Sequence, residues 1–175
     1  MKRYFVTPMI TVAVAVLIVG MVVSAQDKSV KVPDGLALSE FKGYEEWPAV
    51  APSHTDHSTK VILGNPIMMK AYRDGIPGSG KAVPDGAMMA KVEWEQKKDT
   101  NSPYDVTVPD TLKSLAFMVK DSKRFANTGG WAWAKFTYDP QSHALKPEGR
   151  GTACGYVCHQ RVQSRDFVFT QYGRR

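Results

Sequence analysis

The chain has 175 residues, of which 43% are hydrophobic, and a formal charge of +6. This length predicts one domain with one modest core. The Lys and Arg residues are scattered along the chain and are not gathered in one stretch with aromatic residues, so we expect no nucleic-acid partner. A small anionic ligand or an acidic redox partner is compatible with the charge.

The first 25 residues have the pattern of a secretory signal peptide. Lys2 and Arg3 precede an apolar run from Met9 to Val23, and small residues that suit a signal peptidase end this run. We expect residues 1–25 to be removed in export to the periplasm, which leaves residues 26–175 as the mature domain, with a charge of +4. The alternative is an uncleaved membrane anchor, since the run is almost long enough to span a bilayer.

The first half of the mature chain is predicted to contain helices and strands in alternation. Ser39 and Pro48 delimit a short helix, over 39–47, in an otherwise irregular segment. Asn65-Pro66 begin a second helix that ends at Gly75. The expected strands are residues 59–63, which are apolar and β-branched, and residues 87–95.

The second half is predicted to be richer in strands. Residues 131–138 alternate cleanly, with Trp131, Trp133 and Lys135 on one face. The other expected elements are a polar connection over 96–109, strands over 112–119 and 167–172, and a turn of helix over 121–125. Strands separated by short loops predict an α+β fold, mainly an antiparallel sheet with a few helices packed to one side.

The two cysteines of the chain lie close together near its C-terminal end. They are Cys154 and Cys158 in Cys154-Gly155-Tyr156-Val157-Cys158-His159. We interpret this segment as the C-x-x-C-H type of haem attachment, in which both thiols join the porphyrin and the adjacent His159 ligates the iron. The alternatives are a disulfide loop, which export would favour, and a thioredoxin-like redox pair.

The position of this segment distinguishes between classes of haem protein. In small all-helical electron carriers the attachment segment lies near the N-terminus and an axial Met follows it, whereas here 16 residues follow His159 and none is Met. A carrier would therefore need an upstream Met ligand, and this alternative stays open. The upstream methionines, which we interpret as core residues beside a large apolar cofactor, are Met68, Met69, Met88, Met89 and Met118.

Four segments between about residues 32 and 172 resemble the cytochrome P-460 and cytochrome c′-beta family. They are Pro84-Asp85-Gly86-Ala87-Met88-Met89-Ala90-Lys91, Lys120 to Asn127, Gly130-Trp131-Ala132-Trp133, and Cys154 to His159 followed by Asp166-Phe167-Val168-Phe169-Thr170. The resemblance implies a sheet-rich homodimer with one five-coordinate haem c per chain, bound by His159. Family members with a lysine joined to the porphyrin oxidise hydroxylamine towards nitrous oxide, and members without that link bind nitric oxide and similar gases.

The resemblance implies that the cross-linking lysine is Lys91, five residues after the Asp85-Gly86 turn. Its nitrogen must lose a proton to react, and burial beside an apolar ring lowers the pKa of a lysine. Alternation puts Lys91 on one face with Met89 and Glu93. Judged on the strand alone, Lys91 is expected to face solvent, because lysines are rarely buried.

Hydroxylamine oxidation also needs a base near the iron-bound ligand. Glu148 and Arg150 shortly precede Cys154, and Glu93 shares the Lys91 face, so these three are the candidate distal residues. Each is otherwise an ordinary exposed charge. If no acid reaches this side of the haem, gas binding becomes the better interpretation.

Three functions follow from the sequence. The first is a hydroxylamine-oxidising enzyme that passes electrons to a redox partner, such as another cytochrome; the second is a nitric oxide binding protein; the third is an electron carrier. The paired His54 and His57 lie in a polar stretch with no third ligand nearby, and His143 is isolated, so we expect no further metal site from them. Trp131 and Trp133 are expected to lie in the core or at a subunit interface.

Overall fold

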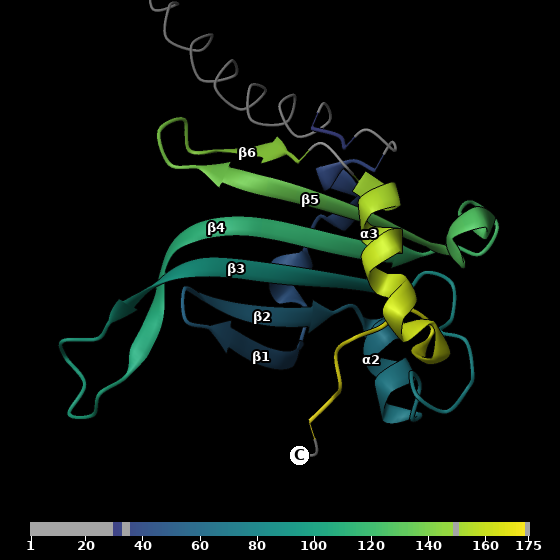
Figure 1. The fold of residues 1–175 in the computed structure, drawn as a ribbon, viewed down its shortest axis with the longest axis horizontal. Helices are drawn as coiled ribbons and strands as arrows, with labels where there is room; N and C mark the ends of the chain where they lie inside the picture. The colour runs from purple at the N-terminus through teal and green to yellow at the C-terminus, as the bar shows by residue number, and fades with distance from the viewer. Residues whose placement is uncertain (1–29, 33–35, 149–150, 174–175) are drawn as a thin grey trace, which may run out of the picture.

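The computed structural model describes residues 30–32, 36–148 and 151–173, so the predicted signal peptide lies outside the described residues. Its framework is an antiparallel sheet in which each strand lies beside its neighbours in the chain (Figure 1). The strands are β1 (Ala49–Thr55), β2 (Ser58–Gly64), β3 (Met88–Lys98), β4 (Thr107–Lys120), β5 (Trp131–Asp139) and β6 (Ala144–Pro147). Together with the short helices, this sheet confirms the predicted α+β fold.

Two α-helices pack against the sheet. Helix α2 (Pro66–Arg73) joins β2 to β3, and its N-cap is the predicted Asn65, whose Oδ1 accepts a hydrogen bond from the Met68 N–H at 2.9 Å. Helix α3 (Gly151–His159) follows β6 and packs on β5. The 3₁₀ helices are η1 (Leu38–Phe41), η2 (Tyr44–Glu46), η3 (Ala126–Thr128) and η4 (Gln160–Arg165). Within the described ranges, no helix is long and apolar enough to cross a bilayer.

Both faces of the sheet are buried, and each has its own core. Helix α2 and the segment after η4 cover one face, where the core includes Met68, Met89, Met118, Trp131, Trp133 and Phe167. The N-terminal segment covers the other face, where the core includes Phe41, Ala90, Leu115, Phe117 and Phe136. The rings of Phe41 and Phe117 stack there, with centroids 4.3 Å apart. Adjacent residues of a strand such as β3 are therefore buried on opposite faces.

The two edge strands, β1 and β6, were not predicted from the sequence. Each contains a proline, Pro52 or Pro147, which is compatible with an edge position but weakens the strand pattern. Strands β3 and β4 also extend into the predicted polar connection at 96–109, where they pair through Gln96 with Pro109 and through Lys97 with Val108. The part of β3 and β4 within 96–109 extends past the two cores into solvent, so its side chains can be polar.

Three predicted elements need correction. The predicted strand at 167–172 is irregular, because Asp166 and Phe167 have positive φ angles of 48° and 64° and turn the chain away from the sheet. The predicted helix at 39–47 is the pair of 3₁₀ helices η1 and η2. The predicted helical turn at 121–125 is a hydrogen-bonded turn that leads into η3.

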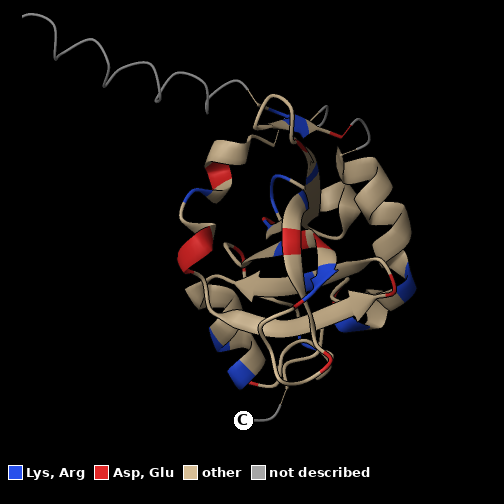
Figure 2. Ribbon diagram, turned by 90° about the vertical axis from the view of Figure 1, so that its left-hand side faces the viewer, with Lys and Arg blue, Asp and Glu red and all other residues tan. Residues whose placement is uncertain are grey.

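Charged residues of both signs are interspersed over the molecule. Figure 2 shows segments with Lys or Arg beside segments with Asp or Glu. Several pairs join neighbouring strands, for example Lys97 with Asp110 at 2.7 Å and Lys113 with Glu95 at 3.2 Å. Such exposed pairs contribute little to stability individually.

Glu40 fastens the N-terminal segment to the turn before η3. Its Oε1 accepts a hydrogen bond from the Ala37 N–H at 2.7 Å, and its Oε2 accepts one from Arg124 Nη1 at 2.8 Å. Burial raises the pKa of Glu40, but these hydrogen bonds outweigh burial and hold the pKa below its ordinary value of 4.5. The stabilising contribution of this carboxylate is therefore complete above pH 4.5 and is lost as the pH falls through the lowered pKa.

We expect Glu40→Gln to lower the free energy of unfolding at neutral pH by about 0.5 to 1 kcal/mol. The difference from the parent protein should vanish in acid, because Glu40 is then protonated in both the folded and the unfolded states. Urea unfolding over an acid series measures this, with Glu46→Gln in η2 as the control. A difference that persists unchanged in acid would contradict the role of the charge.

Candidate functional site

Helix α3 carries the cysteines and lies directly on β5. Thr152 is buried, and its Oγ1 accepts a hydrogen bond from the Trp133 N–H at 3.2 Å. One turn further, a Cβ added at Gly155 would lie 2.3 Å from Trp133 Cγ. Only glycine permits this approach, so Gly155 sets the distance between α3 and the sheet.

The cysteine spacing corrects our assignment of the attachment segment. Three residues separate Cys154 from Cys158, whereas C-x-x-C-H has two. In α3 the two cysteines are four positions apart, which places both on one side of the helix, one turn from each other. Both are free and exposed thiols. They are therefore available to one edge of a bound group despite the longer spacing.

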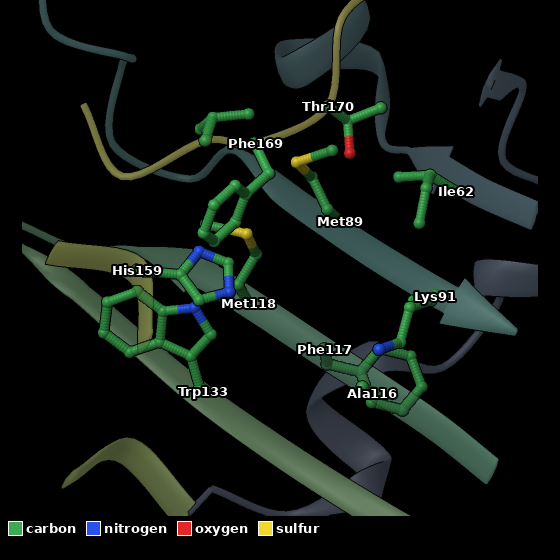
Figure 3. Close-up of a pocket in the computed structure, with 11 residues that line it drawn as sticks. Ile62, Met89, Lys91, Ala116, Phe117, Met118, Trp133, His159, Phe169 and Thr170 are labelled. Carbon is green, nitrogen blue, oxygen red and sulfur yellow. The ribbon is translucent and has the colours of Figure 1, made fainter. Parts of the chain in front are cut away.

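His159 is the last residue of α3, and its imidazole is held by a hydrogen bond. Its Nδ1 lies 2.7 Å from the Phe167 carbonyl oxygen, so Nδ1 carries a proton and donates it to that carbonyl. Burial lowers the pKa of His159 and outweighs the opposing effect of this hydrogen bond. The ring is consequently neutral near pH 7, with Nε2 free for a metal. The rings of Trp133 and Phe169 flank it, with centroids at 5.1 and 4.8 Å (Figure 3).

Two neighbouring cavities meet at His159. The first, of about 260 Å³, lies between the sheet and residues 168–170, and its lining is mainly apolar. The second, of about 230 Å³, reaches Cys154, Cys158 and Glu148. The residues that line both are Lys91, Ala116, Phe117, Trp133 and His159. This space suits a flat apolar group that is anchored at one edge by the thiols and approached by His159.

Lys91 lies on the floor of this space. In the sheet register Ile62, Lys91, Ala116 and Lys135 stand side by side on β2 to β5. Lys91 is half-buried, which differs from the solvent-facing position that the strand alone predicted. Burial lowers the pKa of Lys91, and the nearby Glu93 opposes this effect only in part. Lys91 is therefore easier to deprotonate than an ordinary lysine.

The three distal candidates lie in different places. Glu148 lines the second cavity, where it pairs with Lys135 at 2.8 Å and accepts a hydrogen bond from Thr137 at 3.2 Å. The hydrogen bond from Lys135 lowers the pKa of Glu148. Glu93 lies two residues beyond Lys91 on β3, where its Oε2 accepts a hydrogen bond from the Ser114 hydroxyl at 3.2 Å, and it lines neither cavity. Arg150 lies outside the described residues.

Methionine and histidine residues that the sequence analysis singled out pack against other side chains or lie on an edge strand. Met89 and Met118 line the first cavity, and the Met89 sulfur accepts a hydrogen bond from the Tyr72 hydroxyl at 3.9 Å. His54 lies on the edge strand β1 and not in a loop, and His143 contacts the Tyr138 hydroxyl at 3.0 Å. Within the part of the chain that the structure describes, no group of three His, Cys, Asp or Glu residues could hold a metal ion.

Sequence reasoning missed three residues that shape the site. Gly155 allows α3 to approach β5 closely. The small Ala116 leaves space on the floor of the cavity beside Lys91, and Lys135 forms the ion pair with Glu148. The alternation of residues 131–138 had already placed Lys135 on the face of Trp133. The roles of Gly155 and Ala116 depend on which residues face them, which no local pattern reveals.

The free thiols, the neutral imidazole and the cavity they share define a haem protein. The sequence model of the cytochrome P460 family matches residues 41–170, a range that includes every site residue described above. The chain therefore belongs to the cytochrome P460 family, and it is a c-type haem protein. Comparison with curated proteins finds none that matches the chain.

Proposed function

We propose that the protein is a periplasmic cytochrome that oxidises hydroxylamine. In this proposal Cys154 and Cys158 hold the haem, His159 ligates its iron and Lys91 is joined to the porphyrin. The observation that carries the proposal is that Lys91 and His159 line the same two cavities. A haem held by these residues would supply an iron site for the substrate and an acceptor for its electrons.

Lys91 is suited to form the covalent link. Among the described contacts its ammonium has no hydrogen bond or ion pair, and the small Ala116 stands opposite it in the register. Its lowered pKa increases the uncharged fraction that can act as a nucleophile. Burial therefore favours reaction of Lys91 over that of an exposed lysine such as Lys97, whose side chain is 60% exposed.

Glu148 is the best candidate for the base. It is the one carboxylate among the described residues that line the two cavities. Glu148 is ionised near neutral pH, so its oxygens can accept a proton or orient a donor. The hydrogen bond from Lys135 that lowers its pKa also makes it a weaker base than an unpaired carboxylate. Lys135 and Thr137 fix the position of this carboxylate.

We expect Glu148→Gln to reduce hydroxylamine consumption by about 100-fold or more, as loss of a general base typically does. The matched control is Glu93→Gln, which removes a carboxylate from the same face but not from a cavity lining. Steady-state consumption with a soluble electron acceptor measures both variants. A larger loss in Glu93→Gln than in Glu148→Gln would contradict the assignment of the base.

A second candidate function is nitric oxide binding without turnover. The lining of the 260 Å³ cavity favours it, since its described residues include no carboxylate and Lys91, Thr170 and His159 are the polar ones. An apolar pocket suits a small uncharged gas. Under this alternative the protein would bind nitric oxide tightly and consume no hydroxylamine, and the same assay distinguishes the two.

The proposed electron partner is another cytochrome. Val157 on α3 and Phe169 beside His159 are 67% and 49% exposed, so apolar side chains are accessible near the site. Exposed apolar side chains of this kind suit a transient redox encounter. The homodimer is likewise a proposal, which rests on the family resemblance.

A further inference from the structure

Lys120 and Asp166 form an ion pair, with side chains that are 6% and 13% exposed, that has no direct part in the proposed haem ligation. Lys120, the last residue of β4, is 5% exposed, and its Nζ lies 2.9 Å from both carboxylate oxygens of Asp166. The same Nζ donates to the Gly129 carbonyl at 2.9 Å. Removal of two charges from water is unfavourable, so a buried pair persists only where its partners are well arranged.

The pair lies at an unusual turn of the backbone. Asp166 and Phe167 both have left-handed φ angles, 48° and 64°, which residues with a side chain rarely adopt. Besides Lys120, Asp166 binds the Val83 N–H through Oδ2 at 2.7 Å. The Phe167 ring packs on Gly129 so closely that a Cβ there would lie 2.3 Å from the ring. Contacts from three separate segments therefore hold this turn.

The turn directs a carbonyl group at the haem ligand. Because the chain reverses at Asp166 and Phe167, the Phe167 carbonyl oxygen lies 2.7 Å from His159 Nδ1. A hydrogen bond of this kind fixes the tautomer and orientation of a ligating imidazole and raises its basicity. The turn thus connects the Lys120–Asp166 ion pair to the ring that is to bind iron.

We propose that Lys120 and Asp166 are positioning residues for His159, which they orient through the turn and the Phe167 carbonyl. This inference rests on the proposed ligation of iron by His159. The pair touches no reacting atom, so its effect is on the strength of the iron–histidine bond. Loss of the hydrogen bond on Nδ1 weakens that bond and favours ferrous over ferric iron.

The test is resonance Raman spectroscopy of the ferrous holoprotein together with redox titration. In Asp166→Ala and Lys120→Met, the iron–histidine stretching band should move to lower frequency and the reduction potential should rise. Asp166→Asn should show a smaller shift, because asparagine tolerates left-handed φ angles and can still accept from Val83. The Asp166→Asn variant also allows the band and the potential to be measured if Asp166→Ala does not assemble with haem.

Three further variants separate the possible failures. Phe136→Leu weakens the core on the opposite face and Lys60→Met removes the Lys60–Glu93 pair, so neither should move the band. His159→Gly should abolish it. A band that persists in His159→Gly would overturn the ligand assignment itself. A band that is abolished in His159→Gly but unchanged in the Asp166 and Lys120 variants would overturn only the positioning role.

Discussion

Replacement of Lys91 by methionine is expected to abolish hydroxylamine oxidation while the haem stays on Cys154 and Cys158. Methionine is of similar length and is apolar, so it suits a half-buried position on the cavity floor. The variant lacks only the nitrogen that can join the porphyrin. We expect turnover to fall about 1000-fold or more, which corresponds to roughly 4 kcal/mol of transition-state stabilisation.

The matched control is Lys113→Met on β4. Lys113 has a side chain that is 42% exposed and pairs with Glu95, and its neighbour Ser114 is the residue of β4 that contacts Glu93 on the site face. We would compare Lys91→Met with Lys113→Met by their hydroxylamine turnover and their absorption spectra, recorded at equal haem content. Unchanged turnover in Lys91→Met would show that hydroxylamine oxidation does not require a covalent link from Lys91 to the porphyrin.

Substitution of Gly155 by leucine is expected to prevent correct docking of α3 on the sheet. Even a Cβ at this position would lie 2.3 Å from Trp133 Cγ, and Trp133 is itself 6% exposed and has little room to move. We expect the free energy of unfolding to fall by about 3 kcal/mol, as in severe overpacking. Most of the haem should be lost, because the thiols and His159 are no longer set against the cavity.

Val157→Leu is the control for this prediction. It introduces the same side chain into the same helix at a position that is 67% exposed. Denaturant unfolding and the haem content after export measure both variants. Normal haem content in Gly155→Leu would show that the distance between α3 and β5 does not govern haem binding.

Local signals were sufficient for the middle of the fold. Asn65-Pro66 begin a helix because the cap and the first-turn proline act within three residues, and the alternation of residues 131–138 marks a strand that is buried on both faces. The segment at 167–172 has a strand-like composition, but the left-handed Asp166 and Phe167 depend on distant partners. The edge strands β1 and β6 were also hard to predict, because their prolines weaken the strand pattern and the strands form by pairing with β2 and β5.

The site was predictable where its chemistry is local. Cys154, Cys158 and His159 stand together in the sequence, although their spacing is one residue longer than C-x-x-C-H. The orientation of Lys91 was not predictable, because both faces of β3 are buried and alternation cannot identify which face meets α3. Lys120 and Asp166 are 46 positions apart, so only the fold reveals their pairing.

We propose that one haem is held from both sides, by α3 and by β3. Peptide mapping by mass spectrometry, on protein matured in a host that exports it and attaches haem, can detect both attachments in one experiment. We expect haem joined to the peptide with Cys154 and Cys158 and also to the peptide with Lys91. Haem on the cysteine peptide alone would contradict the cross-link, and a haem-free cysteine peptide would contradict the attachment.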